Sequence, residues 1–521
     1  MFNCVGKSVH VRSRLSDSPF SESGESTSLD QIGRITHIVT VKQLDSNTPD
    51  GHLDITDMAL AVEQSPYFTE RRSNGGLIVS EAPKFDLESY AANYDEYSRV
   101  SRLLNIARLC PPLALDALRL AIPTSKSAKD TQQYLDLIKL LHSINPDDDL
   151  ATVDDAWVEK TNKLNEHETE RLEHELRGYK NNLIKESIRM GQEDLGTHFL
   201  NMNRRDQATK AYQKMREFCT TPKHIAEMTL KLAYINMVTP NWIAAVSTAQ
   251  KARSLTLRPE DKPRFDSVSQ ACTGLGYLGS GNYGQAAHAF LAVDPSYATV
   301  GPVANIDFSR AVMTANDIAV YGGLCALASM NRQQLQDSVL ENANFRNFLE
   351  LEPHIRRAIS FFCGAKYSQC LAILEAYRTD YLLDIFLGPH VNMLYHLIRS
   401  KSIVQYFVPF SQVTLSALTE AFPRPGGTPQ MMENELVDMI QRGILDARID
   451  TVDQLLIAPP KDSRADAHRG VMETAEEVEH QLRLKLFRIN MMQAGLEIQS
   501  PKSNKSGKNV ASSWGPGQTL G

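Results

Sequence analysis

Three glycines provide the first candidate for chemistry in this chain of 521 residues. Gly274, Gly276 and Gly279 have the spacing G-x-G-x-x-G, which in dinucleotide-binding folds lets the backbone approach a pyrophosphate. That motif needs a strand before its first glycine and a helix that opens at its third. Here apolar residues recur at helical spacing from Phe265 to Leu278. We therefore expect the first two glycines to lie inside a helix, and Gly279 and Gly281 to form a turn.

Other motifs that could carry chemistry are incomplete. The string "VGKS" at Val5 lacks the first glycine of a phosphate loop, because Met1 occupies that position. The string "HETER" at His167 lacks the second histidine of a metalloprotease helix. The seven cysteines show neither C-x-x-C nor zinc spacing, and we interpret them as reduced thiols in a core. We therefore expect no catalytic residues, no metal and no cofactor.

Composition narrows the class of protein further. The net charge of -7 gives no general attraction to nucleic acid or to anionic membranes. The N-terminus has no apolar signal region, and the sequence contains no uninterrupted apolar run of about 18 residues. We expect a soluble intracellular protein that binds neither nucleic acid nor membrane.

Internal repeats indicate the elements that hold these residues. "LNMNRRDQATKAY" from Leu200, "LGSGNYGQAAHAF" from Leu278 and "FCGAKYSQCLAIL" from Phe362 align without gaps, and "MVTPNWIAAVSTA" from Met237 is a looser fourth copy. Each places a large apolar residue before a tight turn and a small residue eight positions later. This pattern is typical of tetratricopeptide-like helical hairpins. It predicts an all-α helical-repeat solenoid across roughly residues 180 to 380.

The region from 390 to 460 has a different order. We expect helices in "PHVNMLYHLIRSKSIVQYFVPF", in "SQVTLSALTEAF" and before Gly443, then two short strands, which is the order of a winged-helix domain. The third helix carries Glu433, Glu435 and Asp438, which disfavours binding to DNA. We instead expect the strand region to pair with a neighbouring subunit through an edge formed by Ile444, Leu445, Ala447, Ile449, Leu455, Leu456 and Ile457.

A last helix is expected at about 470–497. Its apolar positions follow steps of three and four, which places them in one stripe. Such a stripe either folds back onto its own chain or is buried by partner subunits. The stripe consists of Val471, Ala475, Val478, Leu482, Leu486, Ile489, Met492 and Leu496. The segments 1–80 and 498–521 are rich in polar residues, and we expect them to be mostly flexible.

Helical repeats that lead into a winged helix resemble the PCI domain proteins. Within that group, "AWVEKTNKLNEHETERLEHELRGYKNNLIKESIRMGQEDLGTHFL", "FLELEPHIR" and "LGPHVNMLYHLIRSKSIVQYFVPF" resemble the subunit-one family of the COP-nine signalosome, over about Phe85 to Ala458. The paralogous proteasome lid subunit shares the "YKNNLIKESIRMGQEDLG" type of segment. The string from Ile318 to Leu335, "IAVYGGLCALASMNRQQL", is similar to the signalosome branch.

The resemblance implies a scaffold without catalysis. In that family, the complex removes the ubiquitin-like protein Nedd8 from cullins of cullin-RING ubiquitin ligases, and the zinc site lies on another subunit. It implies repeats at 81–260, a PCI domain at 261–460 with its repeats to about 389, partners among PCI and MPN subunits, and a location in cytoplasm and nucleus. A proteasome lid subunit and a winged-helix nucleic-acid binder remain the alternatives.

Overall fold

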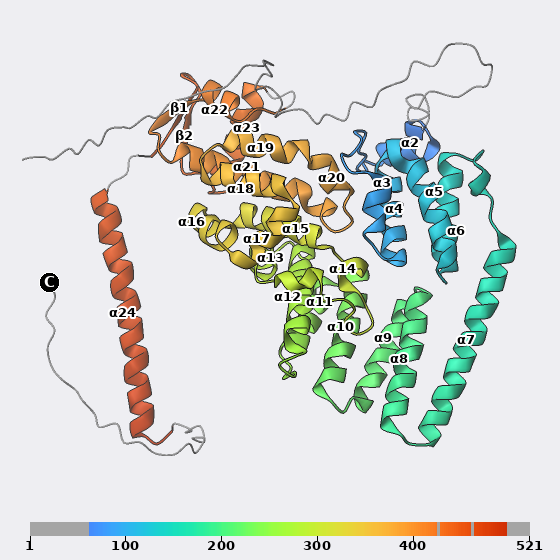
Figure 1. Ribbon diagram of the computed structural model, residues 1–521. Helices are drawn as coiled ribbons and strands as arrows, with labels where there is room; N and C mark the ends of the chain where they lie inside the picture. The colour runs from blue at the N-terminus through green and yellow to red at the C-terminus, as the bar shows by residue number, and fades with distance from the viewer. Residues whose placement is uncertain (1–61, 425–427, 460–462, 497–521) are drawn as a thin grey trace, which may run out of the picture. The chain divides into compact units, whose positions relative to one another are not determined.

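The computed structural model describes residues 62–424, 428–459 and 463–496. Nearly all elements in these ranges are helices, and the three strands form one short sheet near the C-terminus (Figure 1). The predicted fold class, an all-α body of helical repeats followed by a small winged-helix domain, is confirmed. The tail at 498–521 and most of the segment at 1–80 lie outside the described ranges. Within the latter segment, however, residues 66–73 form a helix with Phe68 fully buried.

The N-terminal helices are interrupted where proline requires it. Helix α4 ends at Leu109, Cys110 is extended, and α5 begins at Pro111, because proline fits the first turn of a helix but not its interior. Asp130 and Asp154 then cap α6 and α7 by accepting backbone N–H groups. The elements of this region are α2 (Pro66–Ser73), α3 (Leu87–Ala92), α4 (Glu96–Leu109), α5 (Pro111–Ser127), α6 (Thr131–Ile144), η1 (Asp149–Ala151) and α7 (Asp155–Asn181).

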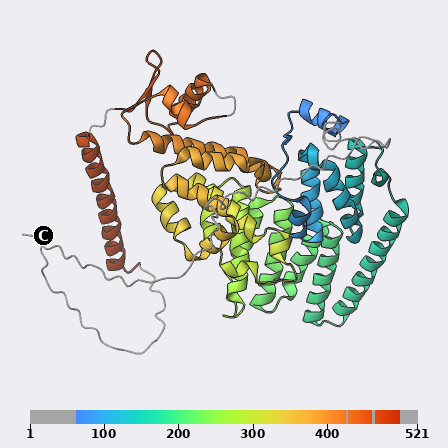
Figure 2. The same cartoon turned by 45° about the horizontal axis from the view of Figure 1, so that its top comes forward.

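The repeat region consists of helical pairs. Helices α8 and α9, α10 and α11, α12 and α13, and α18 and α19 each pack together as a hairpin, and α14 to α17 stand between the third pair and the fourth along the chain (Figures 1 and 2). The helices are α8 (Lys185–Asn201), α9 (Arg205–Met215), α10 (Pro222–Val238), α11 (Trp242–Arg253), α12 (Lys262–Gly279), α13 (Tyr283–Leu291), α14 (Phe308–Ala311), α15 (Ala315–Ser329), α16 (Arg332–Leu335), α17 (Ala343–Leu351), α18 (Pro353–Cys363), α19 (Tyr367–Ala376), α20 (Arg378–Leu383) and α21 (Gly388–Phe407). Shorter turns are η2 (Arg216–Phe218), η3 (Pro295–Ala298) and η4 (Gln336–Leu340).

Three of the aligned repeats turn in the same way at the same position. Asn203, Gly281 and Ala365 each stand three residues after the large apolar residue, and each has a positive φ, of 59°, 76° and 59°. Their amides donate back to the carbonyls of Leu200, Leu278 and Phe362 at 2.9, 2.9 and 3.1 Å. This geometry satisfies the last carbonyls of the preceding helix. In the fourth copy the same position is Pro240, whose ring fixes φ at a negative value, so its turn differs.

The glycine spacing that suggested a nucleotide site is explained by packing. A Cβ at Gly274 would lie 2.8 Å from the Phe290 ring, and one at Gly276 would lie 2.6 Å from the Val246 side chain. Gly279 is the last residue of α12, and a Cβ there would lie 2.3 Å from the Trp242 ring, so it does not belong to the turn as expected. All three glycines lie within α12 and admit neighbouring side chains.

A buried arginine connects the N-terminal helices to the second half of the chain. Arg102 of α4 is 3% exposed and donates to Asp384 at 2.7 Å, to the Tyr90 hydroxyl at 2.9 Å and to the Val312 carbonyl at 3.0 Å. Its guanidinium also lies 3.5 Å from Asp317 of α15. These contacts cross the expected boundary at residue 260, because α4 packs against helices that follow it by more than 200 residues.

The winged-helix domain contains one strand more than predicted. After α21 come β1 (Gln412–Thr414), α22 (Leu415–Ala421), α23 (Pro429–Gln441), β2 (Arg448–Asp450) and β3 (Leu455–Ile457). The prediction of one helix across "SQVTLSALTEAF" was wrong at its start, because Val413 pairs with Leu456 of β3. Thr414 caps α22, since its side chain accepts from the Ala417 amide. The last helix, α24, spans Ser463–Gln493.

Candidate interaction surfaces

Helix α24 presents a long apolar face to solvent. Its predicted stripe residues are all exposed, and the exposed fraction ranges from 46% at Ile489 to 67% at Val471 and Leu496 among the large ones. The helix begins at Ser463, earlier than expected, and ends before Leu496. Gly495 then turns the chain with a φ of 67°, and the Leu496 amide donates to the Met491 carbonyl at 3.0 Å. No residue of the described ranges covers this face. It is therefore open to burial by a partner.

The opposite side of α24 carries further apolar residues that the sequence analysis left out. Leu484 and Phe487 are 55% and 65% exposed, and at 100° per residue they point away from the stripe around Leu482. Met472 is also exposed, at 51%. These residues do not fall on the steps of three and four residues that define the stripe. The spacing of apolar residues in the sequence therefore did not identify them.

The winged-helix sheet has two open edges among the described residues. Its strand order is β1-β3-β2, so β1 and β2 are the outer strands. The Ala458 amide donates to the Ser411 carbonyl, and the Leu415 amide donates to the Gln454 carbonyl. These two hydrogen bonds flank the pairing of β1 with β3. Because antiparallel ladders alternate, the backbone groups of Gln412 and Thr414 point outward on β1, and those of Ile449 point outward on β2. Outward N–H and C=O groups of this kind can accept a further strand.

Part of the predicted edge lies elsewhere. Leu455, Leu456 and Ile457 form β3, which is the central strand, because β1 pairs with its other side. Leu445, Ala447 and Leu456 are buried at 4%, 8% and 0% exposure and belong to the domain core. Of the predicted set, Ile449 lies on an outer strand and Ile444 is exposed at 40%.

The acidic character of α23 is weaker on the surface than in the sequence. Glu435 is buried and accepts from Arg399 of α21 at 2.9 Å, and Arg424 lies 3.3 Å from the same oxygen. Asp438 pairs with Arg442 at 2.9 Å. Glu433 is half-buried and accepts from the Gln430 side chain at 3.2 Å, and α23 itself contains no cation, because Arg442 is the residue directly after it.

The buried thiols lack the environment of a reactive cysteine. Burial raises the pKa of Cys110 to about 11 and that of Cys272 to about 12. Within the described ranges no group of three or more His, Cys, Asp or Glu side chains could hold a metal ion. In the same ranges no helix combines the length and the apolar character that a bilayer span requires.

Comparison with known proteins finds relatives that are named as subunits of protein complexes. Residues 154–338 match the family model of 26S proteasome subunit RPN7, and residues 374–460 match the PCI domain. The chain is 47% identical to COP9 signalosome complex subunit 1 of Emericella nidulans, over 81% of this chain and 84% of that protein. It is 36% identical to the protein of the same name from Neurospora crassa, over 84% of this chain and 93% of that protein.

The proteasome alternative is less similar. Identity to 26S proteasome non-ATPase regulatory subunit 6 of Caenorhabditis elegans is 20%, over 62% of this chain and 77% of that protein. The string from Ile318 to Leu335 that suggested the signalosome branch lies mostly in α15, where Ile318 and Cys325 are buried, and it ends at the buried Leu335 of α16. The extent and level of identity show that the chain belongs to the family of COP9 signalosome complex subunit 1.

Proposed function

We propose that the chain is a non-catalytic scaffold of a signalosome that removes Nedd8 from cullins of cullin-RING ubiquitin ligases. Its partners in this proposal are PCI and MPN subunits, one of which carries the catalytic zinc. Cullin-RING ligases are reached through the assembled complex, in cytoplasm and nucleus. The observation that carries the scaffold role is the exposed apolar stripe of α24, together with membership of the family.

The stripe supports assembly for a physical reason. Leu482, Leu486 and Ile489 are 54%, 60% and 46% exposed, and a monomer gains little from holding such side chains in water. Burial of one large aliphatic side chain contributes roughly 1.5 to 3 kcal/mol. Several of them along one helix therefore provide enough driving force to hold α24 in a bundle with helices of other subunits.

The test replaces Leu482, Leu486 and Ile489 with Asp in the full-length chain. We expect the variant to lose co-purification with the other subunits and the cell to accumulate Nedd8-modified cullins, while the thermal unfolding of the purified chain stays unchanged. The matched control replaces Leu484 and Phe487 with Asp, which removes apolar surface from the opposite side of the same helix. Normal recovery of the complex with the stripe variant would refute the assignment.

The stripe variant could lose assembly with the other subunits while the amount of Nedd8-modified cullin stays the same. That result would separate the scaffold role from the removal of Nedd8. In that case the chain is a scaffold, but the complex it supports does not act on Nedd8. Quantitative blotting of cullins in cells that express only the stripe variant makes this distinction.

A further inference from the structure

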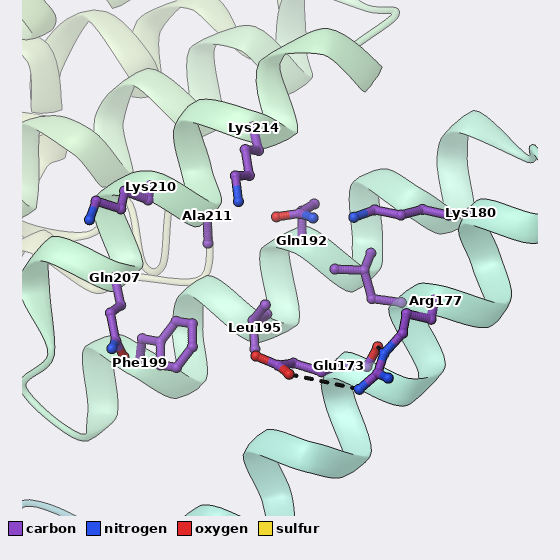
Figure 3. A pocket seen from close by; sticks show the side chains of 11 residues that line it. Glu173, Arg177, Lys180, Gln192, Leu195, Phe199, Gln207, Lys210, Ala211 and Lys214 are labelled. Atoms are coloured by element: carbon purple, nitrogen blue, oxygen red, sulfur yellow. Dashed lines mark hydrogen bonds and ion pairs between the residues drawn. The ribbon is translucent and has the colours of Figure 1, made fainter.

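A groove between three helices combines positive charge with an apolar floor. It lies between α7, α8 and α9 and has a volume of about 400 Å³ (Figure 3). Leu176, Leu195 and Phe199 form its floor and are 5%, 8% and 8% exposed. Its rim carries four cations and one carboxylate, namely Arg177, Lys180, Lys210, Lys214 and Glu173.

The rim cations are largely without partners inside the chain. Lys180, Lys210 and Lys214 are exposed, and their ammonium groups form no ion pair or hydrogen bond with any residue of the described ranges. Glu173 lies 3.9 Å from Arg177 and so offsets one of the four positive charges. Glu193 of α8 does not contribute, because it pairs with Arg189 at 2.6 Å and with the buried Lys231. The groove therefore keeps a net positive rim, which attracts carboxylates.

A buried amide points into the groove without a partner. Gln192 is 3% exposed, and its side chain forms no hydrogen bond within the described part of the chain. Figure 3 shows this amide between the ends of Lys180 and Lys214. Because this amide lines an open groove that water reaches, a ligand group would have to replace water as its hydrogen-bond partner, and a group with matching donors and acceptors would do so with defined geometry. The position of Gln192 indicates a site for a group that accepts or donates hydrogen bonds.

We propose that this groove binds an acidic segment of a partner protein, in which carboxylates flank an apolar side chain. The carboxylates would meet Lys180 and Lys214, and the apolar side chain would cover Leu195 and Phe199. A compact polyphosphate fits less well, because it would leave the apolar floor unpaired and would face Glu173. Leu183 and Ile184 lie between α7 and α8, outside the lining of the groove, and are 81% and 55% exposed, so the same pair of helices also presents apolar surface that suits a protein ligand.

The experiment measures fluorescence anisotropy of a labelled helical peptide that carries four Glu residues around two Leu residues on one face. The full-length chain is expected to bind this probe, and the double variant Lys180→Glu/Lys214→Glu to bind it about tenfold more weakly or less. Gln192→Met keeps the side-chain length and should weaken binding about threefold to tenfold. The control Lys160→Glu/Lys251→Glu makes the same charge change at two exposed lysines outside the groove and should leave the affinity within about twofold.

Three results would overturn the proposal. One is equal loss of binding in both double variants, which would show only general attraction. Another is equal binding of a probe with Ser in place of Leu, together with displacement by equimolar inositol hexakisphosphate, which would define a polyanion site. The third is at least tenfold tighter probe binding after Asp17→Asn, Glu22→Gln and Glu25→Gln, because the chain's own N-terminal segment would then be the occupant. This test does not depend on the Nedd8 proposal, since α24 and the winged helix are unchanged in every variant.

Discussion

At the scale of single residues, small side chains decide where the helices of the repeat region can meet. Gly196 and Gly274 each stand four residues before the large apolar residue of their repeat, and their missing Cβ atoms admit the rings of Tyr212 and Phe290. In the other two copies the same position is Ala233 or Ala358, and both are buried. The position that looked like part of a nucleotide motif is a packing site that all four repeats share.

The substitution Gly274→Ala should destabilise the protein although alanine favours helix. Helix propensity alone would add up to about 1 kcal/mol, but the new methyl would lie 2.8 Å from the Phe290 ring in a packed core, and overpacking costs about 1 to 3 kcal/mol. Gly178→Ala is the matched control, because a Cβ there meets nothing within 4 Å on exposed α7, so it should stabilise by roughly 0.5 to 1 kcal/mol. Thermal unfolding followed by circular dichroism measures whether each variant is more or less stable than the unmodified chain. A stabilised Gly274→Ala variant would contradict the packing explanation.

Residue patterns predicted local packing and missed what several helices form together. The spacing of Leu278, Ala286 and Phe290 lies within one hairpin, so one sequence could predict it. Gln192 stands in the polar string "GQEDLG", where nothing distinguishes a buried amide from a surface one. The groove around it needs α7, α8 and α9 side by side, and the distance between those helices is not encoded in the period of any one of them.

At the scale of elements, the helices and the strands β2 and β3 were predictable, whereas β1 and the order of the strands were not. Helices such as α21 and α24 satisfy their own backbone, and their apolar period appears in the sequence. Strand β1 has three residues and exists because β3 pairs with it from more than 40 residues away. Strand order is a property of that pairing, which explains why β3 was placed at an edge.

The outer side of β2 gives a prediction for assembly. Ile449→Pro removes an outward N–H group without removing a hydrogen bond to β3, so the domain should stay folded while a neighbouring strand loses its partner. We expect the neighbouring subunit's strand to pair with β2 and not with β1. The residues of β1 whose backbone groups point away from β3 are Gln412 and Thr414, and both are polar. Recovery of partner subunits with the tagged variant should fall several-fold, measured by quantitative mass spectrometry. Gln412→Pro makes the equivalent change on β1, the other outer strand. If only this variant loses recovery of partner subunits, the neighbouring strand pairs with β1 and not with β2.

At the scale of the whole molecule, Arg102 makes the first helices part of the same folded body as the PCI region. Asp384 accepts from both Arg102 and the Tyr321 hydroxyl, and Tyr94 donates to Asp317 at 2.9 Å. Burial raises the pKa of Asp317, although the guanidinium of Arg102 acts in the opposite direction. The buried ion pairs of Asp317 and Asp384 therefore depend on Arg102, because it is the cation that both carboxylates share.

Loss of that arginine should loosen the N-terminal helices from the rest of the chain. Arg102→Met leaves two buried carboxylates without their cation, and breaking a buried ion pair in this way costs about 3 to 5 kcal/mol. Arg171→Met is the matched control, because Arg171 also bridges two glutamates but is 47% exposed, so its loss should cost at most about 1 kcal/mol. Hydrogen exchange should accelerate in α3 and α4 of the Arg102 variant and stay unchanged in the control. If α3 and α4 remain as protected as in the unmodified chain, the contacts of Arg102 do not hold the two halves together, and apolar packing alone must do so.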